Sequence, residues 1–165
     1  MAQARTVPAK RQESADPKEG GLLRLDRQLC FAVYGAAQAF TAAYKPLLAP
    51  LGLTYPQYLA MLVLWEADDI TVTAIGDRLG LDSGTLTPLL KRLEAAGLVS
   101  RTRDLADERQ VRVALTAAER SLKQKARAIP AKLLCASGMS PAEIKALHGT
   151  LETLARNLHA AQATD

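Results

Sequence analysis

A polar-faced helix followed by a long hairpin, predicted between residues 82 and 116, constrains the fold of this 165-residue chain more than any other stretch. In its first part, apolar residues recur at i, i+3, i+4 and i+7, a spacing that buries one helix face and is made by Leu86, Leu89, Leu90 and Leu93. The same spacing leaves an outward face with Thr85, Thr87, Lys91 and Arg92. Asp82 or Ser83 can cap the start of this helix, and Gly97 ends it.

Two strands are predicted after Gly97, at residues 98–102 and 110–115, because apolar and polar side chains alternate in the second segment. Residues 103–109 between them are too polar and too many for a tight turn, so we expect a protruding, charged loop. A polar-faced helix beside such a loop is the arrangement of a groove-reading helix with a flanking wing. The pattern therefore indicates a DNA-binding element.

A shorter helix is predicted upstream, at residues 72–79, where Gly80 ends it. Its inward-facing residues are Ala74, Ile75 and Leu79. A turn at Gly80 joins it to the polar-faced helix at residues 84–96, and this length and turn glycine are those of a helix-turn-helix. The break at residues 68–71 leaves room for a short strand.

Further helices are predicted outside this element, at residues 22–49, 54–67, 117–136 and 140–161. The helix at 54–67 is apolar nearly all round, which places it in the centre of the fold. The helix after the hairpin is basic, and Pro130 is expected to kink it. Ser140 and Glu143 are expected to form a capping box at the start of the last helix.

The predicted fold class is mainly α with a small β-hairpin, a winged helix-turn-helix with N- and C-terminal dimerisation helices. We expect a disordered lead-in at residues 1–21, dimerisation helices at 22–52 and 116–161, and the winged DNA-binding domain at 53–115. The terminal helices carry more apolar face than one small winged domain can bury, so a homodimer is expected. Such a dimer would bind a pseudo-palindromic operator in duplex DNA, with half-sites about one turn apart.

Charge supports this interpretation only in part. The formal net charge of +4 suits a polyanionic partner but does not by itself imply one. Basic side chains gather on the outward helix face and the hairpin, at Lys91, Arg92, Arg101, Arg103, Arg109 and Arg112. A solvated charged surface would account for the same residues.

Neither a cofactor, a metal site nor a membrane span is expected. Cys30 and Cys135 have no CxxC spacing, and His148 and His159 lack the cysteine or carboxylate neighbours of a metal site. No apolar run approaches the roughly 20 residues of a membrane span, and no apolar signal segment opens the chain. We therefore expect a cytoplasmic protein, whose thiols stay reduced by default.

Short polar and basic side chains on the polar-faced helix suit the reading of base edges in the major groove. The candidates for DNA contact on this helix are Ser83, Thr85, Thr87, Lys91 and Arg92. In the wing, Arg103 is a further candidate, and Arg109 can enter a narrow minor groove while Asp107 fixes its orientation. A plain surface ion pair on a mobile loop is the alternative for Asp107 and Arg109.

The order of elements, with a helix-turn-helix and wing between long terminal helices, resembles the MarR (multiple antibiotic resistance regulator) family of dimeric winged-helix repressors. The resemblance covers about residues 22–158, and its marks are LGLDSGTLTPLLKRLEAAGLVSR and the wing DLADERQVRVALT. A second resemblance, in LDRQLCFAVY followed by Tyr44 and Tyr55, is to the organic hydroperoxide sensors called OhrR. It implies that Cys30 is a reactive cysteine, and that Cys135 is the resolving cysteine of a two-cysteine sensor.

Three tyrosines bear on the reactivity of Cys30. Tyr34, at i+4, lies one helical turn from Cys30. Tyr44 lies roughly 21 Å from Cys30 along the same helix, at about 1.5 Å per residue, so it cannot contact the Cys30 of its own chain. The resemblance implies that Tyr44 and Tyr55 of a partner subunit approach Cys30 instead. Phenolic hydroxyls that donate to sulfur favour thiolate over thiol, which raises the reactive fraction. A lone cysteine on an apolar helix is otherwise more often a small buried core residue.

The resemblance implies a redox switch. A thiolate at Cys30 would attack an organic hydroperoxide to give sulfenic acid, which would condense with Cys135 of the other subunit. A disulfide needs Cα atoms within about 7 Å, so closing a larger separation would move the recognition helices out of register with DNA. The alternative for Cys135 is a core position beside Leu133 and Leu134.

Two other function classes involve the same residues. A thiol peroxidase is not expected, because no peroxidase loop or Cys-Pro active-site turn is present, so the chain is predicted not to be an enzyme. The second class is a repressor released by a small aromatic ligand, with its cysteines incidental. That class predicts release under fully reducing conditions.

Overall fold

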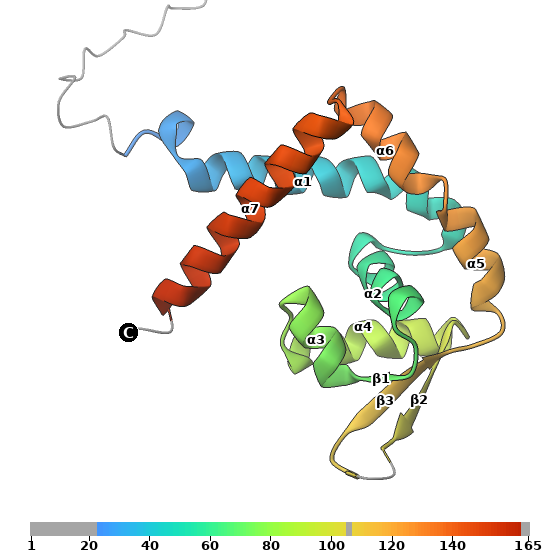
Figure 1. Cartoon of the computed structure of the whole chain (residues 1–165). Helices are drawn as coiled ribbons and strands as arrows, with labels where there is room; N and C mark the ends of the chain where they lie inside the picture. Colours follow the sequence, from blue (N-terminus) through green and yellow to red (C-terminus); the bar gives the residue numbers. More distant parts are fainter. Residues whose placement is uncertain (1–22, 105–106, 163–165) are drawn as a thin grey trace, which may run out of the picture. The chain divides into compact units, whose positions relative to one another are not determined.

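The computed structural model describes residues 23–104 and 107–162 (Figure 1). The lead-in predicted for residues 1–21 lies outside the described residues. The chain divides into two compact units, Met1–Phe40 and Thr41–Asp165. The first unit ends inside the first long helix.

In the first unit, a 3-10 turn, η1 (Leu25–Arg27), precedes helix α1 (Leu29–Leu48). The predicted start of this helix at residue 22 is wrong, because Gln28 adopts an extended conformation (φ −82°, ψ 123°) that separates η1 from α1. Large apolar side chains of this unit are exposed, at Leu23, Leu25, Leu29, Phe31, Val33, Tyr34 and Phe40.

The second unit contains the end of α1, the 3-10 helix η2 (Ala49–Leu51), and helix α2 (Tyr55–Glu66). Gly52 takes the left-handed conformation (φ 66°) that ends η2. Thr54 and Gln57 form a capping box at the start of α2, in which the Thr54 backbone N–H donates to Gln57 Oε1 at 2.8 Å.

The helix-turn-helix consists of α3 (Val72–Leu79) and α4 (Ser83–Ala95). Gly80 provides the predicted turn in the left-handed conformation (φ 64°), and Asp82 is the N-cap of α4. The end of α4 is a Schellman arrangement, because Leu98 N–H donates to the Leu93 carbonyl and Gly97 N–H to the Glu94 carbonyl. The prediction of both helices is confirmed to within one residue.

The wing belongs to a three-stranded antiparallel sheet in the order β1-β3-β2 (Figure 1). Its strands are β1 (Ile70–Thr71), β2 (Val99–Arg103) and β3 (Val111–Leu115). Val113 pairs with Arg101 on one side and Ile70 on the other. The predicted hairpin is therefore correct apart from a shift of one residue at its strand ends, and residues 68–71 do supply the third strand.

After the wing come α5 (Glu119–Ala126), α6 (Ile129–Ser137) and α7 (Pro141–Gln162). The prediction of one kinked helix at 117–136 is wrong, because the chain breaks between α5 and α6. Pro130 in the first turn of α6 lacks a backbone N–H and crowds the carbonyl of Ala126, where α5 ends. The capping box of α7 is confirmed, since Ser140 N–H donates to Glu143 Oε2 at 2.8 Å.

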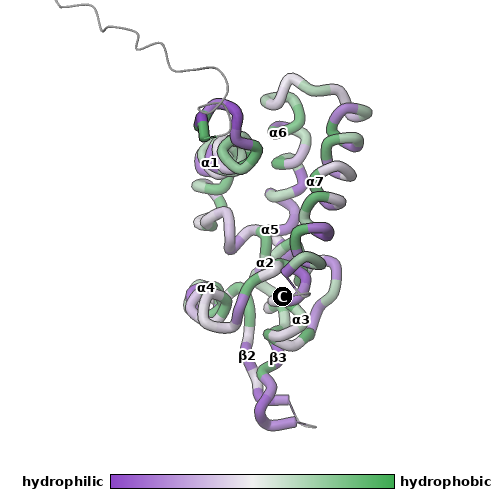
Figure 2. The backbone as a smooth tube through the Cα atoms, turned by 90° about the vertical axis from the view of Figure 1, so that its left-hand side faces the viewer, coloured by the Kyte–Doolittle hydropathy of each residue, from purple (hydrophilic) through white to green (hydrophobic). Residues whose placement is uncertain are grey.

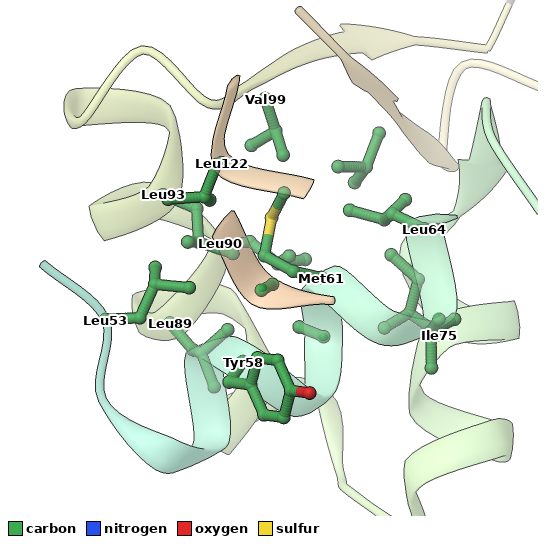
Figure 3. Packing of buried hydrophobic residues seen from close by; sticks show 14 of the residues in the cluster. Leu53, Tyr58, Met61, Leu64, Ile75, Leu89, Leu90, Leu93, Val99 and Leu122 are labelled. Atoms are coloured by element: carbon green, nitrogen blue, oxygen red, sulfur yellow. The ribbon is translucent and has the colours of Figure 1, made fainter. Parts of the chain in front are cut away.

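The hydrophobic core lies in the second unit and centres on α2, as its all-round apolar sequence predicts (Figure 3). Met61 and Leu64 of α2 meet Ile75 of α3, while α4 and the strands contribute further fully buried side chains, Leu86, Leu90, Leu93 and Val113. Leu122 of α5 closes the same cluster. Large apolar side chains of α7 stay exposed at Leu147, Leu151 and Leu158, and Figure 2 shows apolar residues recurring along this helix.

In the described part of the chain, no single helix is long and apolar enough to span a membrane. The segments Leu29–Leu51 and Tyr55–Glu66 reach that length and apolarity only when taken together, and the chain bends by 70° between them.

Candidate DNA interface and redox site

The start of recognition helix α4 is organised by the Asp82 carboxylate. Thr85 donates to it twice, from its backbone N–H at 2.9 Å and from its hydroxyl at 2.8 Å. These two bonds hold the pKa of Asp82 below its usual range. The hydroxyl proton of Thr85 is thus directed at the cap, which leaves its methyl group and an oxygen lone pair for other contacts.

The remaining predicted contact residues of α4 differ in exposure. Ser83, Lys91 and Arg92 are exposed. Thr87 is half-buried, so it presents less surface than its position on the predicted outer face implied. The four leucines predicted for the inner face, Leu86, Leu89, Leu90 and Leu93, are all buried. The helix therefore turns the predicted face outward.

At the wing tip, Arg109 and Asp107 form the predicted ion pair, with Arg109 Nε donating to Asp107 Oδ1 at 3.1 Å. The Arg109 backbone N–H donates to the same oxygen at 3.1 Å, and Gln110 Nε2 donates to Oδ2 at 3.2 Å. Hydrogen bonds from Arg109 are the main cause that lowers the pKa of Asp107. The Arg109 side chain is 91% exposed, so its terminal amino groups point to solvent.

Not all of the basic residues near the wing are outward. Arg103, at the end of β2, is exposed, and Figure 2 shows hydrophilic residues along the far end of the hairpin. Arg101 has only 16% of its side chain exposed and lies 3.7 Å from Glu94 of α4. Arg112 is held by Asp69 and Asp104. Arg101 and Arg112 are thus in the hairpin as predicted, but each is paired with acidic neighbours.

Tyr44 and Tyr55 come together in the second unit. Their rings stack with centroids 4.6 Å apart and planes inclined by 23°, although the two residues lie on different helices. Burial raises the pKa of Tyr44 to about 12 and also raises that of Tyr55. Both phenols carry a proton at neutral pH, as an ordinary tyrosine does, and can donate hydrogen bonds.

The aromatic contacts extend beyond this pair. Tyr58 lies 5.6 Å from Tyr44, and Trp65 meets Tyr58 edge-on at 6.2 Å. The Trp65 indole N–H then donates to Glu119 Oε2 on α5 at 2.6 Å. Sequence periodicity missed Tyr58, Trp65 and Glu119 as partners, because contacts between separate helices have no signature in local spacing.

Both cysteines are free and exposed, Cys30 on α1 and Cys135 on α6. In the single chain, neither cysteine is therefore a core residue. Tyr34, one turn after Cys30, is also exposed, and its hydroxyl accepts a hydrogen bond from Gln38 Nε2 at 2.8 Å. Within residues 23–104 and 107–162, no group of three or more His, Cys, Asp or Glu side chains is placed to hold a metal ion.

Comparison with known proteins identifies the family. The profile described as "Transcriptional regulator SarA/Rot" matches residues 42–126. The organic hydroperoxide resistance transcriptional regulator of Bacillus subtilis (strain 168) is 48% identical over 137 residues, which cover 83% of this chain and 93% of that protein. The chain belongs to the MarR-type winged-helix transcriptional regulators, with the SarA/Rot proteins and the OhrR sensors.

Two other relatives of this MarR-type regulator are informative. The HTH-type transcriptional regulator TtmR of Methylorubrum extorquens (strain PA1) is 56% identical over 136 residues, 82% of this chain and 70% of that protein. The structure of reduced AbfR bound to DNA aligns with TM-score 0.67 and 38% identity over 82% of this chain and 95% of that one. Disulfide-formed AbfR aligns with TM-score 0.53 and 39% identity over 80% and 93%. The predicted fold class is confirmed, and the chain is a DNA-binding transcriptional regulator.

Proposed function

We propose that this regulator is a redox-responsive repressor that binds duplex DNA as a homodimer and releases it when an organic hydroperoxide oxidises Cys30. The observation that carries the proposal is the stacked pair Tyr44 and Tyr55, two partly buried phenols on different helices that can donate hydrogen bonds. In the proposed dimer, the Tyr44 and Tyr55 hydroxyls of one subunit donate to the Cys30 sulfur of the other. Tyr34 supplies a third hydroxyl one turn from Cys30.

The oxidation proceeds in two steps. The Cys30 thiol first gives up its proton, and the thiolate attacks the terminal peroxide oxygen. The O–O bond breaks, and the alkoxide that leaves takes up a proton to become an alcohol. Sulfur is oxidised by two electrons to sulfenic acid. The thiol of Cys135 in the other subunit then attacks this sulfur, water leaves, and an intersubunit disulfide forms. The exposure of both thiols favours these steps.

Dimerisation is supported by the apolar surface of the terminal helices. Leu29, Phe31 and Phe40 on α1, and Leu147 and Leu158 on α7, are each more than two-fifths exposed in the single chain. Burial of apolar surface stabilises an assembly by roughly 25 cal/mol per Å². A second copy is the partner that such helices fit. In the proposal the chain is not an enzyme, needs no cofactor and acts in the cytoplasm, where thiols stay reduced.

In the proposed complex, α4 enters the major groove and the wing reaches the minor groove. Contacts from α4 come from Ser83, Thr85, Thr87, Lys91 and Arg92, and contacts from the wing come from Arg103 and Arg109, with Asp107 orienting Arg109. The 91% exposure of the Arg109 side chain supports its role at the tip.

The test is a gel shift of the wild type, Cys30→Ser and Cys135→Ser, with and without cumene hydroperoxide, beside non-reducing electrophoresis. The wild type should release DNA and run as a disulfide-linked dimer. Cys30→Ser should keep binding DNA in the presence of peroxide, and Cys135→Ser should form no intersubunit disulfide. Release of Cys30→Ser by peroxide would contradict the redox mechanism.

A second candidate function, release by a small aromatic ligand, is favoured by one observation. A cavity of about 280 Å³ lies beside α2, and its lining includes the apolar side chains of Tyr58, Leu62 and Trp65 together with Lys123, Arg127 and Glu66. Apolar walls with two cations against one carboxylate suit a small aromatic acid. Benzoate should then release the DNA from Cys30→Ser under reducing conditions, and no release would remove this candidate.

A further inference from the structure

The base of the wing carries an ion-pair network centred on Arg112 of β3. Arg112 Nε donates to Asp69 Oδ1 at 2.9 Å, and Nη1 donates to Asp104 Oδ2 at 3.2 Å. Its Nη2 donates to the Asp69 backbone carbonyl. All three nitrogens of the guanidinium are thus engaged, and the side chains of Arg112 and Asp104 are only 35% and 15% exposed.

One end of this network is a strained turn. Asp69 has φ 52°, and it is the one non-glycine residue with positive φ in the described parts of the chain. Few residue types adopt this conformation readily, although aspartate is among the more tolerant. The neighbouring Asp68 Oδ1 accepts from the backbone N–H of Asp69 at 2.7 Å and of Leu115 at 2.8 Å. The turn before β1 is therefore fixed to β3 by side chains as well as by strand pairing.

The other end of the network reaches the wing tip. Asp104 Oδ1 accepts from the Asp107 backbone N–H at 3.2 Å, while the Asp104 N–H donates to the Gln110 carbonyl at 3.0 Å. Asp107 in turn accepts the two bonds from Arg109. Continuous hydrogen bonds thus join the body of the domain to the arginine at the tip.

We infer that Arg112 is a positioning residue for DNA binding, which acts through Asp104 and Asp107 to hold Arg109 in its DNA-reading orientation and does not itself contact DNA. This inference rests on the proposed role of Arg109. A side chain that is already held in place loses less conformational freedom when it binds, so a fixed wing binds more tightly than a mobile one.

Two different roles for Arg112 would give different results. If Arg112 is only a partly exposed surface ion pair, its loss leaves DNA affinity unchanged. If Arg112 contacts a phosphate, its loss weakens binding and lowers the salt dependence even when Arg109 is absent. The interaction between substitutions at Arg109 and Arg112 therefore distinguishes positioning from both of these roles.

The experiment measures fluorescence anisotropy of a labelled duplex that the wild-type protein has selected from a random-sequence library, at several salt concentrations. The proteins are the wild type, Arg109→Ala, Arg112→Gln and the double variant. Asp104→Asn tests the same network from its acidic side, and Arg120→Gln, an exposed arginine on α5, controls for the loss of one positive charge. Thermal unfolding followed by circular dichroism checks that each variant is folded.

We expect Arg112→Gln and Asp104→Asn to weaken binding about 2- to 10-fold, beyond any effect of Arg120→Gln. In the Arg109→Ala background, Arg112→Gln should change neither the affinity nor the salt dependence. Additive losses of affinity in the double variant would overturn the inference. It would also be overturned if Arg109→Ala weakened binding but Arg112→Gln and Asp104→Asn did not. Unchanged binding by Arg109→Ala would overturn the proposed role of the wing as well.

Discussion

Replacing Trp65 with phenylalanine removes the indole N–H that donates to the buried carboxylate of Glu119 at 2.6 Å. Glu119 is only 8% exposed, so water does not readily replace the lost donor. Lys123, one turn later on α5, donates to the Trp65 carbonyl at 3.2 Å, so the two residues of α5 hold Trp65 by its side chain and its backbone. These two hydrogen bonds therefore join α2 to α5, the helix that follows the wing.

The magnitude follows from these contacts. A hydrogen bond to a charged group contributes about 1.5–3 kcal/mol, and an unpartnered buried acceptor costs a similar amount. The smaller ring also loses packing against Tyr58. We expect Trp65→Phe to lower the free energy of unfolding by about 2–4 kcal/mol. At roughly 2–4 °C per kcal/mol for a chain of this size, the midpoint of thermal unfolding should fall by at least about 4 °C.

The assay is a double-mutant cycle of Trp65→Phe and Glu119→Met, read by far-ultraviolet circular dichroism in denaturant. Protein concentration is kept equal, because the stability of a dimer depends on it. The double variant should be about 1–2 kcal/mol more stable than the sum of the single losses predicts, since no polar group is then left unpartnered. Glu108→Met, at an exposed position in the wing, should add to Trp65→Phe without coupling. Full additivity of Trp65→Phe and Glu119→Met would refute the reasoning.

Three further results are expected. Tyr44→Phe keeps the ring stacked on Tyr55 but removes its hydroxyl, so it should slow the oxidation of Cys30 by cumene hydroperoxide, measured by loss of free thiol. DNA binding by the reduced protein should stay unchanged. An unaltered oxidation rate would argue against Tyr44 as a hydrogen-bond donor to Cys30. The pKa of Asp82 is lowered in the folded state, so the stability that its carboxylate contributes is present above pH 3.8 and is lost as pH falls through the folded-state pKa. In Asp82→Asn, the free energy of unfolding should therefore fall less steeply with decreasing pH in this range. A variant curve parallel to that of the wild type would contradict the capping role. Leu90→Ala removes a fully buried side chain and should cost about 2–5 kcal/mol in denaturant unfolding, with a loss below about 1 kcal/mol showing that the core collapses around the gap.

The local parts of the fold follow from local signals. The helix-turn-helix can be predicted to within one residue because Gly80 and Asp82 mark its turn by backbone conformation and capping, both of which depend on neighbouring residues alone. The proline at position 130 correctly indicates a disruption, but its presence does not distinguish a bend from a break. The helix ends at Ala126 and a new one begins, because the proline removes a backbone donor in the first turn of α6.

Long-range contacts are harder to foresee. Arg112 alternates with apolar residues along β3 and so resembles an outward cation, yet Asp69, 43 positions earlier, accepts its Nε–H. Likewise, Trp65 and Glu119 lie 54 positions apart and look like an apolar helix residue and a surface acid. Such pairs depend on how separate elements pack, which spacing within one element does not encode. Only the family resemblance links Tyr44 with Tyr55 before the structure is known.

The tight connection between α4 and β2 constrains the DNA as well as the protein. Gly97, with φ 70°, and the Schellman bonds at Leu93 and Glu94 leave no slack between the recognition helix and the first strand of the wing. In the proposed complex, this short connection limits how far the helix contact and the wing contact can shift relative to each other along the duplex. One base pair inserted between the helix contact and the wing contact turns the duplex by about 34–36°. An insertion between the two contacts should therefore weaken binding more than a substitution at a base pair that neither contact touches.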